Sequence, residues 1–201
     1  FEDAGAIVEQ ATFDFKRSAF ELSEAWDRMI TISGGLGTIE EFKAGGIDLL
    51  RDHADDLPDE LIYWVEDAYK RGYIDFHDDE VIRTEVFDQI QGAFQDYDLL
   101  LSPTLACHPV KNDVNRNTVG PSTINGVKTE PLIGFCLTFF CNFTGNPAAS
   151  IPAGLSKDGF PVGLQLIGNR YGERDLLSAS AAYERVNPWA ADYEVTKNRM
   201  L

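Results

Sequence analysis

The spacing of hydrophobic and polar positions changes near residue 97 of this 201-residue chain. Between residues 18 and 94, apolar side chains recur every three to four positions, which is the period of one helix face. From residue 98 onward, apolar side chains come in short runs that are bounded by Gly and Pro, which is typical of buried strands. The pattern therefore predicts a helix-rich segment followed by a segment that forms the core strands.

Four helices are expected in the first segment. The first opens with a capping box at Ser18-Ala-Phe-Glu21, in which each of the two side chains satisfies a free backbone N–H group. Glycines predict where three of the helices end. The expected ranges are 18–33, closed by Gly34-Gly35; 38–44, opened by a second capping box at Thr38; 56–71; and 78–94.

The chain opens on a different signal. Phe1 to Gly5 reads as the last turn of a helix with a left-handed glycine after it, and Ala6 to Gln10 reads as a strand. A helix of which only the tail is present predicts that the sequence begins inside an element. We therefore expect a fragment, a processed subunit or part of a longer chain.

The second segment predicts three strands and a closing helix. Asp98 to Pro103 is an apolar run of the kind buried on both faces in a parallel sheet. Ala149 to Leu155 and Val162 to Ile167 are joined by Lys157-Asp-Gly159, a strong hairpin turn signal. A helix is expected over 173–187. The pattern as a whole predicts an α/β fold with a mixed, largely parallel sheet flanked by helices.

Between these strands lie an irregular stretch and an aromatic one. The stretch from residue 106 to about Pro131 is long for a compact domain, and such loops are usually functional or bound to a partner. Leu132 to Phe143 is apolar and aromatic, and it reads as a buried helix or as the wall of a pocket. Packing is the favoured role, because large apolar side chains are mostly found in cores.

Charge narrows the range of partners. Residues 1–100 carry 25 Asp and Glu against 8 Lys and Arg, and the whole chain has a net charge of −16. A field of this sign repels phosphate backbones, so we expect no nucleic-acid partner.

No run of eighteen apolar residues is present, so we expect no membrane span. Three cysteines without a CxxC pair predict a reducing, cytoplasmic setting with no disulfide framework and no zinc site.

A search for catalytic motifs finds none. The chain has no Gly-x-Ser-x-Gly elbow, no phosphate-binding loop and no His-Glu-x-x-His. Cys107 and His108 are neighbours, and neighbours in an extended chain point to opposite faces, which makes them a poor catalytic couple. The residues alone support the C-terminal part of an α/β enzyme, with no metal and no cofactor.

Three separated segments carry a resemblance that goes further: Leu99-Leu-Leu-Ser-Pro-Thr104, Asn142-Phe-Thr-Gly-Asn-Pro-Ala-Ala-Ser-Ile-Pro-Ala-Gly154 and Gly159-Phe-Pro-Val-Gly-Leu-Gln-Leu-Ile-Gly168. In order and spacing they resemble the C-terminal portion of the amidase signature family. The resemblance implies that 1–201 is the C-terminal part of a single amidase signature domain. Its expected segments are 1–97, helix-rich and acidic; 98–187, the core strands and closing helix; and 188–201, a tail.

The family cleaves amide bonds with a Ser nucleophile, a second Ser and a Lys base, and Gly-rich backbone N–H groups hold the oxyanion. Those residues lie in the family's N-terminal and middle regions. This chain has no Ser-Ser pair, and Ser33-Gly-Gly is better explained as a helix cap. No catalytic residue is therefore carried over. The expected partners are the N-terminal part of the same enzyme and a small-molecule amide, and a homo-oligomer is left open.

The resemblance also implies a substrate wall. Family members shape the acyl side of their pocket with residues after the Ser-Pro-Thr strand and before the Asn motif. In the branch that hydrolyses glutamine for transfer-RNA amidation, an acidic residue stands seven positions before that Asn, where this chain has Phe135. An aromatic side chain cannot pair with an α-ammonium group, so we expect an apolar or aromatic amide. The candidate substrate-binding residues are Thr104, Leu105, Phe135, Thr138 and Phe139.

The sequence-based hypothesis is thus an amidohydrolase part whose Ser-Ser-Lys machinery lies outside this chain. Three alternatives stay open. One is a non-catalytic binding or scaffold module built on the same sheet. The other two are an esterase or carbamate hydrolase, since the same nucleophile attacks those carbonyls, and a transfer-RNA amidotransferase subunit.

Overall fold

A computed structural model describes residues 1–114 and 118–193, and it divides into two compact units. The first unit comprises residues 1–14, 87–108 and the chain from 136 onward. The second comprises residues 15–86 and 109–135. Each unit is assembled from segments far apart in the sequence. The expected tail, 188–201, is described only as far as the 3₁₀ helix η4 (Ala190–Tyr193), and the remainder lies outside the described residues.

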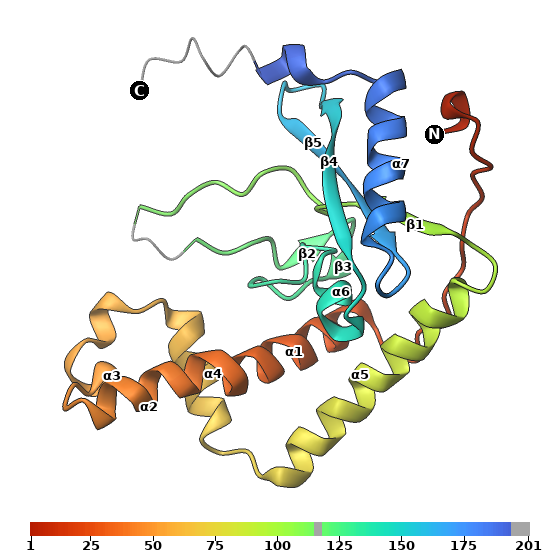
Figure 1. Cartoon of the computed structure of the whole chain (residues 1–201). Coiled ribbons are helices and arrows are strands. Elements are labelled where there is room, and N and C mark those ends of the chain that lie inside the picture. The colour runs from red at the N-terminus through yellow and green to blue at the C-terminus, as the bar shows by residue number, and fades with distance from the viewer. Residues whose placement is uncertain (115–117, 194–201) are drawn as a thin grey trace. The chain divides into compact units, whose positions relative to one another are not determined.

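The first unit is built on a three-stranded sheet with the order β1-β5-β4 (Figure 1). Its strands are β1 (Leu99–Pro103), β4 (Ala148–Leu155) and β5 (Pro161–Gly168). β5 is the central strand, with a hydrogen-bonded neighbour on each side. It also has more buried apolar residues than either neighbour, namely Leu166 and Ile167. Leu166 is fully buried and pairs with Leu101 of β1 and Ala149 of β4.

The β4–β5 hairpin was predicted correctly, turn included. Gly159 adopts φ 78°, a left-handed conformation that glycine accepts without a Cβ clash. The Ser156 N–H group donates to the Phe160 carbonyl at 2.8 Å and closes the hairpin. A bulge between Pro152 and Leu155 interrupts the pairing, because Pro152 has no N–H group to donate.

The expected parallel arrangement is not confirmed. In the described residues, β1 pairs with β5 and β4 pairs with β5, both in antiparallel register. The apolar run of β1 also differs from a strand buried on both faces: Leu100 is buried, whereas Leu101 is 38% exposed. The α/β class itself is confirmed.

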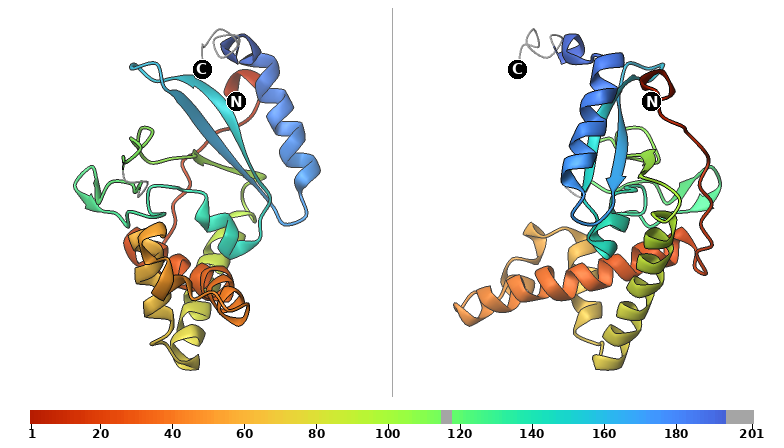
Figure 2. Two further views of the ribbon diagram at one scale, coloured as in Figure 1. Left: turned by 90° about the vertical axis from the view of Figure 1, so that its left-hand side faces the viewer. Right: turned by 45° about the vertical axis from the view of Figure 1, so that its right-hand side comes forward.

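Two helices pack in the first unit. α7 (Glu173–Val186) runs along β4 and β5 (Figure 2), and its buried Leu176 meets the end of the central strand at Gly168. α6 (Phe139–Thr144) ends at the left-handed Gly145. At the chain start, the 3₁₀ turn η1 (Glu2–Ala4) is closed by Gly5 at φ 89°, as predicted.

The strand predicted over Ala6–Gln10 is absent from the structure. This stretch has no assigned strand pairing, and Ile7 is 91% exposed. Its apolar residues matched a strand pattern locally, but a strand also needs a neighbour to bond with, and no pairing partner appears in the described chain.

Helices dominate the second unit. Trp64 and Val65 on α4 pack in its core, together with Ala25, Ile82 and Val86 from other helices. A short hairpin, β2–β3, turns at Asn125-Gly126, where both residues have positive φ. The elements are α1 (Ala19–Ile30), η2 (Thr31–Gly35), α2 (Leu36–Ala44), α3 (Leu49–Asp52), η3 (Ala54–Asp56), α4 (Asp59–Ala68), α5 (Tyr73–Ala93, which passes into the first unit at Phe87), β2 (Thr123–Ile124) and β3 (Val127–Lys128).

The start of the first predicted helix is correct and its end is wrong. The Ser18–Glu21 capping box is present, with both reciprocal hydrogen bonds. Gly34 and Gly35 do not stop the helix, because a π-helical turn, η2, carries it directly into α2. A Cβ at position 35 would make ordinary van der Waals contacts of 3.4–3.7 Å with Thr31, Leu61 and Val65, so the site would also accept a side chain. Thr38 lies inside α2 and donates to the Gly34 carbonyl, so it is no cap.

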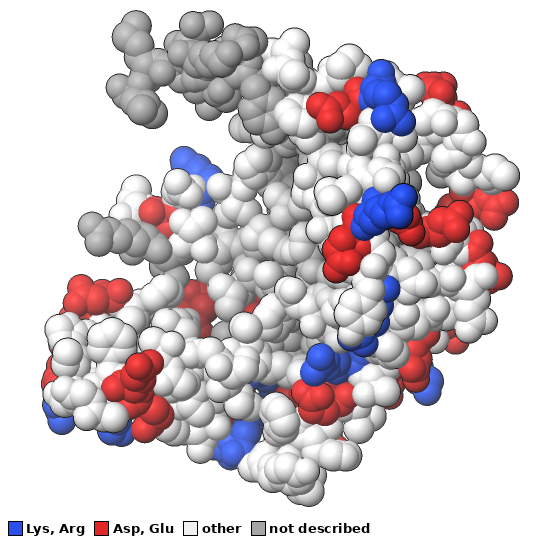
Figure 3. Space-filling model, in the orientation of Figure 1, with Lys and Arg blue, Asp and Glu red and all other residues white. Residues whose placement is uncertain are grey.

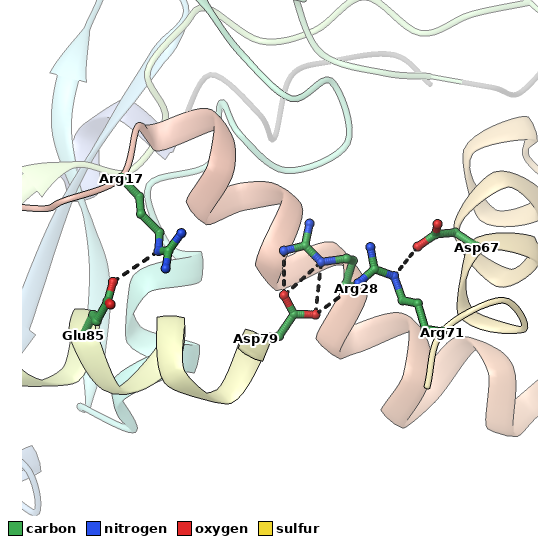
Figure 4. A network of polar contacts seen from close by, with 6 residues as sticks. All are labelled: Arg17, Arg28, Asp67, Arg71, Asp79 and Glu85. Atoms are coloured by element: carbon green, nitrogen blue, oxygen red, sulfur yellow. Dashed lines mark hydrogen bonds and ion pairs between the residues drawn. The ribbon is translucent and has the colours of Figure 1, made fainter. Parts of the chain in front are cut away.

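Ion pairs tie the helices of the second unit together (Figure 4). The Arg28 guanidinium on α1 binds both carboxylate oxygens of Asp79 on α5, with N–O distances of 2.6–3.0 Å. Arg71 bridges Asp79 and Asp67, and Arg17 binds Glu85 at 3.1 Å. Asp79 is 2% exposed, and its contacts with the two guanidinium groups replace the water that its side chain loses on burial.

A second buried carboxyl, Asp27 on α1, faces Glu130 from the 109–135 segment. Both are buried, at 2% and 5% exposure, and the Asp27 Oδ2 atom receives no hydrogen bond from the described residues. The Glu130 carboxylate accepts the backbone N–H groups of Leu132 and Ile133, each at 2.7 Å. Burial first, and then the neighbouring Glu130, raise the pKa of Asp27 to about 9. Asp27 is therefore protonated at neutral pH and can donate to Glu130.

On the face shown in Figure 3, acidic and basic side chains are interspersed, and several groups of opposite charge lie next to each other. Over the whole sequence, 33 Asp and Glu outnumber 17 Lys and Arg. This agrees with the net charge of −16. Among residues 1–114 and 118–193, no helix has the length and apolar character to cross a membrane.

Candidate functional site

Four of the five predicted wall residues lie in the first unit, at the end of β1. The Thr104 N–H group donates to the Gly163 carbonyl of β5 at 3.0 Å, and the Thr104 carbonyl accepts the Leu137 N–H group at 3.1 Å. Leu105 forms an antiparallel bridge with Cys136. The backbone thus brings Thr104 and Leu105 against the segment that carries Thr138 and Phe139.

Side-chain hydroxyls gather at the same strand end. Thr104 Oγ1 and Ser150 Oγ of β4 are 2.6 Å apart and share a hydrogen bond. Gly163 of β5 lies beneath them, and a Cβ there would come within 2.7–3.0 Å of the Thr104 and Ser150 side chains. Glycine is therefore required at 163 for the two outer strands to bring these hydroxyls together.

A buried glutamine holds the adjoining backbone. Gln165 is 2% exposed, and its Nε2 group donates to Ser102 Oγ at 2.9 Å and to the Leu137 carbonyl at 3.1 Å. Because Gln165 bonds both β1 and the 136–138 segment, it fixes the spacing between them.

The chemistry available at this strand end is binding and positioning. Within the described residues, the hydrogen bonds of Ser102 and Ser150 go to a hydroxyl, an amide and a backbone carbonyl, none of which is a general base. Burial raises the pKa of the Cys107 and Cys136 thiols, and that of Cys141 to about 11. Those thiols are protonated at neutral pH, so they are poor nucleophiles.

Phe139 lies behind this surface rather than on it. It is 1% exposed, stacks on Phe140 at 4.2 Å between ring centroids, and meets Phe143 edge-on at 5.9 Å. Thr138 precedes it as the N-terminal flanking residue of α6 and is half-buried, with no side-chain capping bond.

The fifth residue, Phe135, belongs to the second unit and packs on Gly120. A Cβ on Gly120 would lie 2.2 Å from the Phe135 ring, so any larger residue there would displace the ring. The Gly120 N–H group donates to the Pro131 carbonyl at 2.7 Å and holds the loop in place.

Sequence reasoning missed three polar residues of the first unit: Ser150, Gln165 and Asn146. Asn146 is 7% exposed, accepts from Gln91 of α5 at 3.0 Å and donates to the Gly168 carbonyl at 2.7 Å. Ser150 and Gln165 each stand in an otherwise apolar run, and this isolated polarity is the signal that could have found them. Asn146 follows Asn142 and Thr144, so its surroundings in the sequence gave no such signal. In the part of the chain that the structure describes, no group of three His, Cys, Asp or Glu residues could hold a metal ion.

Comparison with known proteins decides the family. The family model described as Amidase matches residues 62–177, more than half of the chain. The chain belongs to the amidase family. It shares 32% identity over 138 residues with an acylamidase of Rhodococcus erythropolis, covering 67% of this chain and 28% of that protein.

Other amidase relatives include a glutamyl-tRNA(Gln) amidotransferase subunit of Alkaliphilus metalliredigens. It is 36% identical over 119 residues, covering 59% of this chain and 21% of that protein. The solved structure of a bacterial aryl acylamidase of the amidase signature family matches with a TM-score of 0.91 and 42% identity, covering 96% of this chain and 39% of that one. The chain thus spans well under half the length of these amidases.

Proposed function

We propose that this chain is the C-terminal part of an amidase that hydrolyses a carboxylic amide with an apolar or aromatic acyl group. In this proposal the N-terminal part of the enzyme supplies the nucleophile and base. Family membership and the similarity to acylamidases support the reaction class. The strand end described above has hydroxyls but no general base among its described hydrogen-bond partners, which supports a nucleophile placed elsewhere.

Thr104, Leu105 and Thr138 of the first unit are proposed to line the acyl side of the pocket, and Phe139 to support them from behind. Phe135 of the second unit is proposed as a further substrate-binding residue, as the family resemblance implies. Thr104 and Leu105 are half-buried and exposed, respectively, so both can meet a ligand. β1 and β4 are the outer strands of the described sheet, and their outer edges are where the N-terminal part would continue it.

The proposed substrate preference rests on the aromatic side chain at position 135. An aromatic ring cannot form the ion pair that an α-ammonium group needs in a desolvated pocket. The ring packs directly on Gly120, where a Cβ on any other residue would displace it. An apolar or aromatic acyl group would complement such a wall, and glutamine would not.

Substrate comparison tests this proposal. The complete enzyme is expected to have a higher kcat/KM for benzamide than for L-glutamine. Replacing Phe135 with Glu should lower kcat/KM for benzamide by about tenfold or more, since it places a charge against an apolar group. Phe135→Leu, the matched control, should retain most of the activity toward benzamide.

Two results would count against the proposal. Efficient glutamine hydrolysis with little turnover of benzamide would place the protein with the amidotransferase relatives. A complete protein that hydrolyses neither amides nor esters would favour the non-catalytic scaffold.

A further inference from the structure

Gln165 is a buried polar residue in the middle of the apolar strand β5. Its cross-strand neighbours are Ser102 on β1 and Ser150 on β4, so the three side chains form one row on the same face of the sheet. Side chains alternate along a strand, so Gly168 belongs to the opposite face, where a Cβ would lie 3.5 Å from Leu176 of α7. The helix therefore packs on one face of the sheet, and Gln165 stands on the other.

The two amide hydrogens of Gln165 have separate acceptors. Its Nε2 group donates to Ser102 Oγ at 2.9 Å and to the Leu137 carbonyl at 3.1 Å. The Ser102 hydroxyl donates in turn to the Pro103 carbonyl at 3.1 Å, which leaves its oxygen free to accept from the amide. A flipped amide would set its own oxygen against the Leu137 carbonyl oxygen, so the two acceptors fix the orientation of the side chain.

These bonds hold the backbone of Leu137 from both sides. Its N–H group donates to the Thr104 carbonyl at the end of β1, and its carbonyl accepts from Gln165 on β5. Thr138, which is proposed above to line the acyl side of the pocket, is the next residue along the chain. Gln165 itself is 2% exposed, so it can influence a ligand only through the residues that it holds.

We propose that Gln165 is a positioning residue for amide hydrolysis, because it holds Leu137 and thereby places Thr138 on the acyl side of the pocket. This inference rests on the function proposed above. Without the amide, Ser102 Oγ and the Leu137 carbonyl would lose their donor, and the 136–138 segment would be held less firmly against β1. The acyl group would then bind less tightly, whereas the nucleophile, which in the proposed function lies in the N-terminal part, would stay in place.

Steady-state kinetics of the complete enzyme with benzamide test this role. Gln165→Met keeps an unbranched side chain but has no donor, so it should raise KM about tenfold and change kcat by less than about threefold. Leu176→Ala is the matched control, since it truncates a buried side chain that packs on the opposite face of the same sheet. It should destabilise the protein but leave KM within about twofold of wild type.

Gln165→Glu provides a second readout, which a purely structural role would not change. An ionised carboxylate cannot donate to the Leu137 carbonyl, whereas a protonated carboxyl can. Burial raises the pKa of a carboxyl, so we expect this one to become protonated between about pH 8 and about pH 5. Over that range, the KM of the variant divided by the KM of wild type should fall towards one. The adjoining Cys136 thiol, and the Cys107 thiol that interacts with it, stay protonated because burial raises the pKa of both.

Three results would overturn the positioning role. The first is a Gln165→Met enzyme with an unchanged KM or with a loss confined to kcat. The second is an equal rise in KM in Leu176→Ala, which would reduce the effect to general destabilisation. The third is a KM ratio for Gln165→Glu that does not depend on pH. A wild-type enzyme that does not hydrolyse benzamide would instead refute the proposed function, and this inference with it.

Discussion

Replacing Phe139 with Ala is expected to lower the free energy of unfolding of the complete protein by about 3 to 5 kcal/mol. Phe139 is 1% exposed and touches two other aromatic rings of α6. Truncation removes the transfer free energy of the ring and leaves a cavity that the stacked neighbours cannot easily close. Chemical denaturation of wild type and variant measures the loss.

Phe160→Ala is the matched control, because Phe160 is 44% exposed in the hairpin turn. We expect that change to cost less than about 1 kcal/mol. Phe139→Leu should recover part of the stability and keep KM for benzamide near the wild-type value. An unchanged stability in Phe139→Ala, combined with a raised KM, would instead mean that the ring contacts substrate directly.

The stability of the protein is expected to fall as pH rises above the ordinary carboxyl range, and Asp27→Asn should remove most of that fall. The folded state holds the pKa of Asp27 at about 9, whereas an unfolded carboxyl titrates near its usual value. Between those two pKa values the folded state binds more protons than the unfolded chain does. The stabilisation is therefore complete at low pH and is lost progressively as pH rises towards 9, by at most about 1.4 kcal/mol per pH unit.

Asparagine replaces the proton of Asp27 with a permanent N–H donor, so the bond to Glu130 no longer depends on pH. At pH 8 the variant should be more stable than wild type by about 2 kcal/mol or more, and at pH 5 the two should be similar. The other charges near Asp27 are Glu24, which raises its pKa further, and Arg28, which lowers it and is engaged by Asp79. Denaturation curves between pH 5 and 9 measure the difference in slope.

Glu130→Gln tests the role of Glu130 separately from the pH-dependent role of Asp27. Its carboxylate accepts two backbone N–H groups, and an amide has one oxygen to share between them and Asp27. This variant should lose stability throughout the pH range. Parallel pH profiles for wild type and Asp27→Asn would show instead that Asp27 is ionised in the folded protein.

Short-range chemistry made several elements predictable. The Ser18–Glu21 capping box and the Gly159 turn each depend on hydrogen bonds or φ angles within a few residues. The hairpin of β4 and β5 followed from its apolar runs and that turn. Such features need no knowledge of the rest of the fold.

The wrong predictions concern features that depend on residues distant in the sequence. Gly34 and Gly35 look like a helix end, yet both lie in the π-helical turn η2, which carries α1 directly into α2. The apolar run of β1 gave no information on the direction of its neighbour, which proved to be the antiparallel β5. Strand direction depends on chain topology, which short patterns do not encode.

In the candidate site, too, some residues could be predicted from the sequence and others could not. Thr104, Leu105 and Thr138 came from a family resemblance, and the backbone bonds of Thr104 and Leu105 bring them to the segment that carries Thr138. Ser150 and Gln165 could not be found from spacing, because they reach the site only through the pairing of β4 and β5 with their neighbours. The pairing of Asp27 with Glu130 was equally out of reach, since about a hundred residues separate them in the sequence.

We propose that this chain supports an amidase active site whose nucleophile lies elsewhere in the enzyme. The most direct measurement is to treat the complete protein with a fluorophosphonate, which modifies activated serines, and to locate the modified residue by peptide mass spectrometry. We expect one rapidly modified serine outside residues 1–201, together with loss of amide hydrolysis. Modification of Ser102 or Ser150, or no modification in an enzyme that remains active on amides, would contradict it.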